Sequence, residues 1–237
     1  MRILLTNDDG IFAPGMQVMM DFARRLGDVV VYAPKTEQSG KSHAIEIHQP
    51  FTVEPVTLPQ GIQGYSVDST PADCVRYALL GRHEPVDLVL SGVNRGPNIG
   101  MDIIYSGTVG AIFEAAALGV KGIAISTGFE TFATAVEQLD NVWTYFTQRK
   151  LLDKCGHYNV NIPENYTGTI RITRQGGPYY SDEFPTCGDN LYMPTGICVH
   201  RDQGDLSLDT DAVINGHISI TPITVDRTNA AVYEMLR

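Results

Sequence analysis

Short apolar runs alternate with segments of helical periodicity over the first 130 residues, and this alternation constrains the fold more than any other feature. Four runs have the length and composition of buried strands: 2–6, 28–34, 87–92 and 122–127. Helical patterns fill 15–26 and 108–118, and Thr70-Pro71 is a typical helix start, with a hydroxyl cap and proline in the first turn. Continuous apolar strands separated by helices are typical of a parallel sheet covered on both faces. We therefore predict an α/β fold with a mostly parallel sheet.

The pattern changes after a predicted helix at 130–149. Strand-like segments at 157–162, 169–174 and 217–223 surround a stretch rich in glycine, proline and tyrosine, and 228–237 has the pattern of a short helix. This predicts a core domain over residues 1–150 and a β-rich extension over 151–237. The acidic stretch 202–211, with Asp202, Asp205, Asp209 and Asp211, misses the spacing of a calcium loop, so we interpret it as a solvated loop.

Charge and composition exclude several classes of protein. The formal charge is −10, with 11 basic and 16 acidic residues in 1–150 and 6 and 11 in 151–237, so neither part offers a basic surface for duplex nucleic acid. The four cysteines form no CxxC pair, which disfavours a zinc ribbon or a thioredoxin-like site. No segment resembles a signal peptide or approaches the roughly 18 apolar residues of a membrane span. We expect a cytoplasmic protein without membrane contacts.

Two adjacent aspartates, Asp8 and Asp9, follow the first strand in the segment TNDDG. Like charges this close raise each other's pKa, so a neutralising partner is expected. Two solvated turn residues are the alternative, because Asn-Asp-Gly sequences favour turns. In a loop that follows a buried strand, a hard divalent cation such as Mg²⁺ or Mn²⁺ is the natural partner of paired carboxylates. The pair therefore predicts a metal site and points toward phosphate chemistry.

Three loops rich in oxygen ligands leave the carboxyl ends of predicted strands, where ligands collect in open parallel sheets. The first loop holds Asp8 and Asp9, the second (35–43) offers Ser39 and His43, and the third (91–111) is rich in glycine and opens into a helix. Glycines let backbone N–H groups approach an oxyanion, and a helix N-terminus adds a favourable dipole. Taken alone, the third loop could equally be a flexible glycine loop with a Ser/Thr cap. Together with the paired aspartates it favours a phosphate site.

Other phosphate-binding patterns do not fit. The chain lacks the GxGxxG fingerprint after its first strand, and the segment SGKS (39–42) has only the tail of a P-loop. An aspartyl-phosphate mechanism would use Asp8 or Asp9 as nucleophile. Adjacent side chains point in different directions, so two metal-ligand roles are the more natural interpretation. His43 is a candidate for proton transfer to the leaving oxygen, although a structural role fits it better.

Five segments together resemble the SurE family of survival proteins, in the family's order and over nearly the whole chain: TNDDG (6–10), TPADCV (70–75), SGVNRGPNIGMDIIYSGTVGA (91–111), NVNIP (159–163) and SITP (219–222). The resemblance implies a Rossmann-like three-layer core and a divalent-metal-dependent phosphatase. Its substrates would be nucleoside 5′- and 3′-monophosphates, with short polyphosphate for some members. It also implies a homodimer or homotetramer with an exchanged C-terminal segment, and hence oligomer contacts in 151–237.

Carried over by position, the resemblance gives this chain a ligand set for one divalent metal ion. The metal ligands would be Asp8, Asp9, Ser39 and Asn94, with Asp8 and Asp9 as the catalytic carboxylates. The phosphate would contact Asn94, Asn98, Ser106, Gly107 and Thr108. The expected activity is that of a 5′-nucleotidase, and the alternative is a non-catalytic module that binds or senses nucleotides without turning them over.

Overall fold

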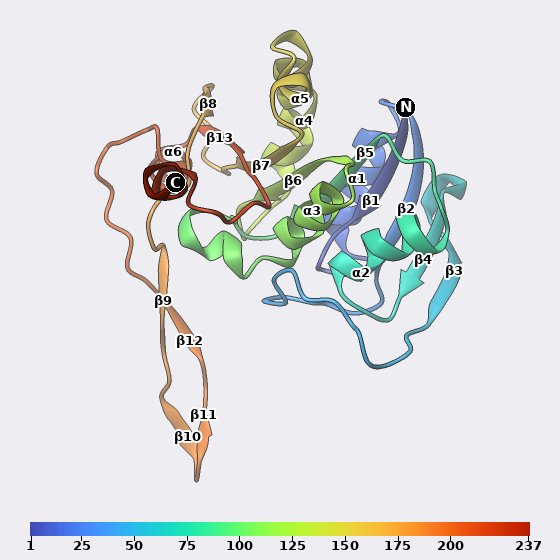
Figure 1. The fold of residues 1–237 in the computed structure, drawn as a ribbon, viewed down its shortest axis with the longest axis horizontal. Coiled ribbons are helices and arrows are strands. Elements are labelled where there is room, and N and C mark those ends of the chain that lie inside the picture. Colours follow the sequence, from blue (N-terminus) through green and yellow to red (C-terminus); the bar gives the residue numbers. More distant parts are fainter.

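A computed structural model describes residues 1–237 (Figure 1). Strand β1 (Arg2–Thr6) lies inside its nine-stranded sheet. The strand order is β3-β4-β2-β1-β5-β6-β7-β13-β8. The parallel part contains β4 (Gln63–Val67), β2 (Asp28–Pro34), β1, β5 (Leu88–Asn94), β6 (Lys121–Thr127) and β7 (His157–Ile162). The carboxyl ends of these strands therefore meet at one edge of the sheet.

The two flanks of the sheet contain its antiparallel pairs. Strand β3 (Val53–Thr57) runs antiparallel to β4 at one edge. At the other, β13 (Ile218–Pro222) runs antiparallel to β7 and parallel to β8 (Ile170–Ile172). The prediction of an α/β fold with a mostly parallel sheet is confirmed. Three strands of 151–237, β7, β13 and β8, continue the same sheet, so the two predicted parts of the chain share it.

Helices cover both faces of the sheet, and each face has its own apolar core (Figure 1). The larger core, of 27 buried residues, lies under α1 (Pro14–Ala23), α4 (Ala133–Gln148) and α5 (Leu151–Lys154). The smaller, of 16 residues, lies under α2 (Pro71–Arg76) and α3 (Gly107–Ala117). In β1, Ile3 and Leu5 face the larger core and Leu4 the smaller, because side chains alternate across a strand. This explains why the central strands are apolar at every position.

Helix α2 begins as the sequence predicts. The Thr70 hydroxyl accepts the N–H of Asp73 at 3.1 Å, and Pro71 fills the first turn. None of the helices combines the length and the apolar character that crossing a bilayer requires.

A β-ribbon projects from the C-terminal part and extends away from the body of the molecule (Figure 1). It pairs β9 (Tyr180–Glu183) with β12 (Thr195–Cys198) and, nearer its tip, β10 (Thr186–Gly188) with β11 (Leu191–Tyr192). We call residues 180–198 the arm. The last helix, α7 (Ala230–Leu236), has no buried residue.

The interpretation of residues 202–211 as a solvated loop is wrong for half of its aspartates. Asp209 begins helix α6 (Asp209–Ile214), and both Asp209 and Asp211 are 0% exposed. The Asp209 carboxylate accepts the backbone N–H of Gly176 from another segment, and that of Asp211 accepts the N–H of Gln203 within the same stretch. The spacing of acidic residues in the sequence could not show these partners. Asp202 and Asp205 are the two at the surface.

Candidate active site

The end of β1 and the start of α3 meet at Asp8. Thr108 Oγ1 donates a hydrogen bond to Asp8 Oδ1 at 2.5 Å, and both residues are buried. Gly107 packs against the same carboxylate, because a Cβ atom on it would lie 2.9 Å from Asp8 Cβ and 3.1 Å from Oδ2. Two segments separated by about 100 residues in the sequence thus form one surface at the carboxyl edge of the sheet.

Helix α3 presents its N-terminus at this surface. Ser106 is the N-cap, and its Oγ accepts the N–H of Val109 at 3.1 Å. No acidic residue occupies the first turn. The remaining first-turn N–H groups and the helix dipole favour an anion here, as does the hydroxyl hydrogen of Ser106.

The pKa values of both aspartates are raised above the ordinary value for aspartate. Burial is the largest cause that raises the pKa of Asp8, and the hydrogen bond from Thr108 opposes it. Burial, followed by the charge of Asp8, raises the pKa of Asp9 to about 6, while the backbone N–H of Arg95 lowers it. Two carboxylates whose charges are this poorly compensated are a favourable place for a cation.

Asn94 is the last residue of β5, and Ser39 lies on the second loop. The amide nitrogen of Asn94 donates to Gly96 O at 2.7 Å, which leaves its amide oxygen for a cation. Ser39 is exposed and donates to Glu37 Oε1 at 2.6 Å. The backbone N–H of Gln38 donates to Asp8 O at 2.7 Å, so the second loop lies against the first. The role of Ser39 as a ligand remains a prediction.

Asn98 is held at the strand ends by side chains that the sequence reasoning did not assign to the site. Its backbone N–H donates to Asn161 Oδ1 at 2.8 Å, and its carbonyl accepts from Asn159 and Asn161 at 2.7 and 2.9 Å. Its own amide donates to Ser126 Oγ at 2.8 Å. In β7, Asn159 and Asn161 are buried on the face opposite Tyr158, Val160 and Ile162. Two asparagines at alternate positions of an otherwise apolar strand are the signal that could have identified them.

The second loop crosses helix α3 at Gly110. A Cβ atom on this glycine would lie 2.2 Å from Ser42 O, so only glycine permits the contact. The Ser42 N–H donates to Tyr105 O at 2.9 Å, and its hydroxyl to Ile104 O at 2.5 Å. The glycine-rich loop is therefore joined to the second loop as well as to the first.

A buried carboxylate anchors the end of the second loop. Glu114 of α3 lies 2.7 Å from His43 Nε2 and accepts from the Arg76 guanidinium at 2.9 Å. Burial alone would raise the pKa of Glu114, but the hydrogen bonds from His43 and Arg76 outweigh it and lower the pKa. His43 thus attaches the second loop to Glu114 on the side of α3.

The available donors suit a hard cation. No group of three or more histidine, cysteine or acidic side chains is placed to hold a metal ion, so a cation here would need neutral oxygen donors beside the two carboxylates. Two carboxylates, an amide oxygen and a hydroxyl are oxygen ligands of the kind that Mg²⁺ and Mn²⁺ accept, with water completing the shell. These residues therefore fit the predicted metal.

Comparison with known proteins gives one consistent result. Residues 3–182 match the family model described as "Survival protein SurE". The chain is 38% identical to a 5′-nucleotidase SurE of Desulforudis audaxviator, with 100% of this chain and 96% of the relative covered. It is 40% identical to a 5′-nucleotidase SurE of Heliobacterium modesticaldum, with 97% and 88% covered. The crystal structure of SurE protein from Aquifex aeolicus superposes with a TM-score of 0.77 at 33% identity, over 100% of this chain and 98% of that one.

Proposed function

Because this chain belongs to the SurE family, we propose that it is a 5′-nucleotidase, a phosphomonoesterase that hydrolyses nucleoside 5′-monophosphates with the help of one divalent metal ion. The names of its relatives support the reaction. The observation that carries the proposal here is the junction of Asp8 with the start of α3 through Thr108, because it places a cation site beside an anion site.

Each group has a distinct part in the proposed reaction. Mg²⁺ or Mn²⁺, held by Asp8, Asp9, Ser39 and Asn94, would supply positive charge to the phosphoryl group and lower the pKa of the attacking water. The first-turn N–H groups of α3 and the Ser106 hydroxyl would stabilise charge on the phosphoryl oxygens. Thr108 holds Asp8 in place, and Gly107 keeps the space beside it open.

The proposal extends to nucleoside 3′-monophosphates and short polyphosphate. The groups around Asp8 that would recognise the substrate are backbone N–H groups and a hydroxyl, which bind a phosphoryl group without reading the base. Tyr105 directly precedes the N-cap and is 60% exposed, and we propose it as a contact for the nucleoside. A homodimer or homotetramer in the cytoplasm is also part of the proposal.

Phosphate release from a panel of nucleoside 5′- and 3′-monophosphates and short polyphosphate, with Mg²⁺, Mn²⁺ or a chelator, tests the function directly. We expect release that requires the metal. Activity that survives exhaustive chelation would remove the metal from the mechanism. Nucleotide binding without release under every condition would instead support the non-catalytic module, although all four predicted metal positions hold oxygen ligands.

Replacement of Asp8 tests the site. Asp8→Asn should lower turnover at least about 100-fold on every phosphomonoester, because a metal ligand is lost. Asp28→Asn, which makes the same change at an exposed position, is the matched control. Wild-type turnover by Asp8→Asn in the presence of metal would rule out this assignment.

A further inference from the structure

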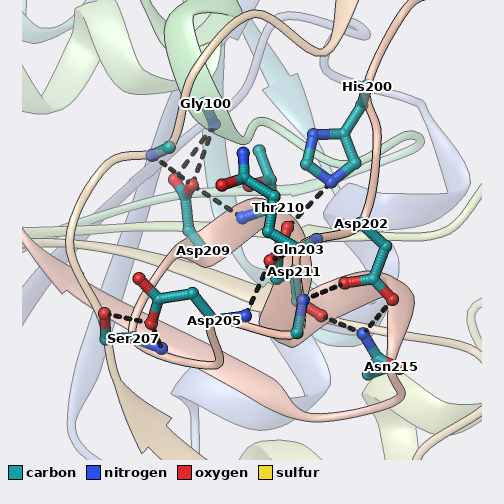
Figure 2. Close-up of polar contacts among 12 residues, drawn as sticks. Gly100, His200, Asp202, Gln203, Asp205, Ser207, Asp209, Thr210, Asp211 and Asn215 are labelled. Carbon is teal, nitrogen blue, oxygen red and sulfur yellow. Dashed lines mark hydrogen bonds and ion pairs between the residues drawn. The ribbon is translucent and has the colours of Figure 1, made fainter.

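Three segments meet at the side chain of Asp209 (Figure 2). Both carboxylate oxygens accept the N–H of Gly100 at 3.1 Å. Oδ1 also accepts the N–H groups of Gly176 and Thr210, each at 2.7 Å. The residue is 0% exposed, and burial raises its pKa while these N–H groups lower it. Backbone amides therefore compensate this buried carboxylate, and those of Gly100 and Gly176 come from distant parts of the chain.

The contact with Gly100 lies in the middle of the glycine-rich loop. Asn98, just before it, is the loop's attachment to the sheet, and Ser106 after it caps α3. Met101 and Asp102 also contact the C-terminal part, through Gly177 O at 3.1 Å and the N–H of Tyr180 at 3.2 Å. The C-terminal part of the chain thus sets the path of the loop as it approaches the anion site.

The backbone at Gly100 has no room for a side chain. Its φ is +59°, and a Cβ atom would lie 2.2 Å from Gly177 O. The approach of the two glycine backbones brings the N–H of Gly100 within reach of Asp209.

We propose that Asp209 is a positioning residue for the phosphate site: through Gly100 it holds the glycine-rich loop so that the start of α3 faces Asp8. The inference rests on the proposed function and adds to it a residue from the C-terminal part of the chain. A carboxylate is required because every neighbour at both oxygens is an N–H donor. An asparagine of the same size would turn an NH₂ group toward one of these donors and leave buried groups unpaired.

Asp211 provides a matched control on the same helix (Figure 2). It is also 0% exposed and accepts two backbone N–H groups, from Gln203 at 3.0 Å and Asp205 at 2.9 Å. His200 Nε2 lies 2.8 Å from its other oxygen. These contacts stay within residues 200–211 and do not reach the glycine-rich loop. Asp211→Asn therefore disturbs a comparable buried network away from the anion site.

The experiment compares Asp209→Asn with Asp211→Asn in the full-length chain. Measurements are kcat and KM for a nucleoside 5′-monophosphate with Mn²⁺, the inhibition constant of inorganic phosphate, the affinity for Mn²⁺ alone, and the free energy of unfolding. For Asp209→Asn we expect kcat/KM to fall about 10- to 100-fold, because a loop displacement of about 1 Å is enough to misplace the phosphoryl group. Phosphate inhibition should weaken with it, while Mn²⁺ affinity stays at the wild-type value.

Asp211→Asn should keep wild-type kinetics even if it loses as much stability. Equal kinetic losses in the two variants, or wild-type kinetics in Asp209→Asn, would overturn the positioning role. A wild-type chain without turnover on any nucleotide would instead overturn the proposed function. Direct binding of inorganic phosphate, weakened only in Asp209→Asn, would still support the positioning role in that case.

A second pair of variants covers the event that Asp209→Asn does not fold. Gly100→Ala forces the loop away from Gly177, whereas Gly168→Ala has the same kind of positive φ, +91°, with no atom within 4 Å of the added Cβ. Both substitutions place alanine at a positive φ that L residues rarely adopt, but only Gly100→Ala adds a clash with backbone. Weaker phosphate inhibition in Gly100→Ala alone supports the inference, and equal inhibition in both contradicts it.

Discussion

At the scale of single residues, the charge of Asp9 lowers the free energy of unfolding of the metal-free protein. Burial and the neighbouring charge of Asp8 raise the pKa of Asp9 from 3.8 to about 6. Because the folded value is the higher one, the stabilisation of the fold is complete below the unfolded pKa and is lost as the pH rises through about 4 to 6. Because the Asp9 side chain is partly exposed and screened by solvent, the loss amounts to about 1–2 kcal/mol above pH 6.

Asp9→Asn should therefore raise the stability of the metal-free protein while it abolishes metal-dependent turnover. At pH 7.5, with chelator, we expect the free energy of unfolding to increase by about 1–2 kcal/mol, and the gain should shrink as the pH is lowered toward 4.5. Denaturant titrations across this pH range measure it. Asp28→Asn, at an exposed position, should show no such pH-dependent gain. A gain for Asp9→Asn that is constant with pH would contradict the electrostatic explanation.

Residue chemistry also explains which parts of the site the sequence could reveal. Asp8, Asp9 and the glycine-rich loop have local signals, since a paired carboxylate or a glycine run before a helix is visible in the sequence itself. Glu114 and Asp209 have none, because their function depends on partners 71 and 109 positions away. Nothing in the sequence near either residue indicates that it accepts hydrogen bonds from loops of the site.

At the scale of elements, helix α3 supports two loops of the site at once. Its N-terminus faces Asp8, and its middle holds the second loop through the contact of Gly110 with Ser42 and the pair of His43 with Glu114. The metal ligand expected from the second loop, Ser39, lies only a few residues from these anchors. The position of the second loop therefore depends on a buried carboxylate one helix turn beyond Gly110.

Glu114→Gln should loosen the second loop. The variant removes the charge that pairs with His43 and Arg76, so we expect a loss of about 2–4 kcal/mol in stability, weaker Mn²⁺ binding and faster hydrogen exchange in residues 38–44. Glu137→Gln on the exposed face of α4 is the control and should change none of these. Retained exchange protection in residues 38–44 of the Glu114 variant would show that Gly110 and Ser42 suffice to hold the loop.

Sequence patterns predicted helices and strands best where a short apolar run corresponds to a buried element. The first two strands coincide with the runs predicted at 2–6 and 28–34, and Thr70 caps its helix as expected. The prediction that residues 202–211 form a solvated loop was wrong for Asp209 and Asp211, because it considered only whether their spacing suits a cation. Asp209 and Asp211 instead bind backbone N–H groups, and such partners leave no pattern in the acidic residues themselves.

At the scale of the whole molecule, the arm and α7 leave apolar side chains uncovered in a single chain. The arm exposes large apolar side chains, among them Phe184, Leu191, Tyr192 and Met193, each more than half exposed. Met235 and Leu236 of α7 are more than 80% exposed. An isolated two-stranded ribbon is marginally stable in water, and apolar surface of this kind marks protein contacts. Both features support the proposed assembly of identical chains.

We predict that the full chain is a dimer or tetramer at micromolar concentration and that the arm is needed for at least one of its interfaces. Replacement of residues 182–196 by a short Gly-Ser turn should give a smaller species by light scattering and a lower melting temperature. Cys187→Ser, a near-isosteric change of an exposed side chain in the arm, is the control. An intact chain that is monomeric at these concentrations would contradict the prediction. Because the N–H of Tyr180 at the base of the arm donates to Asp102 of the glycine-rich loop, loss of assembly should also raise KM for the nucleotide.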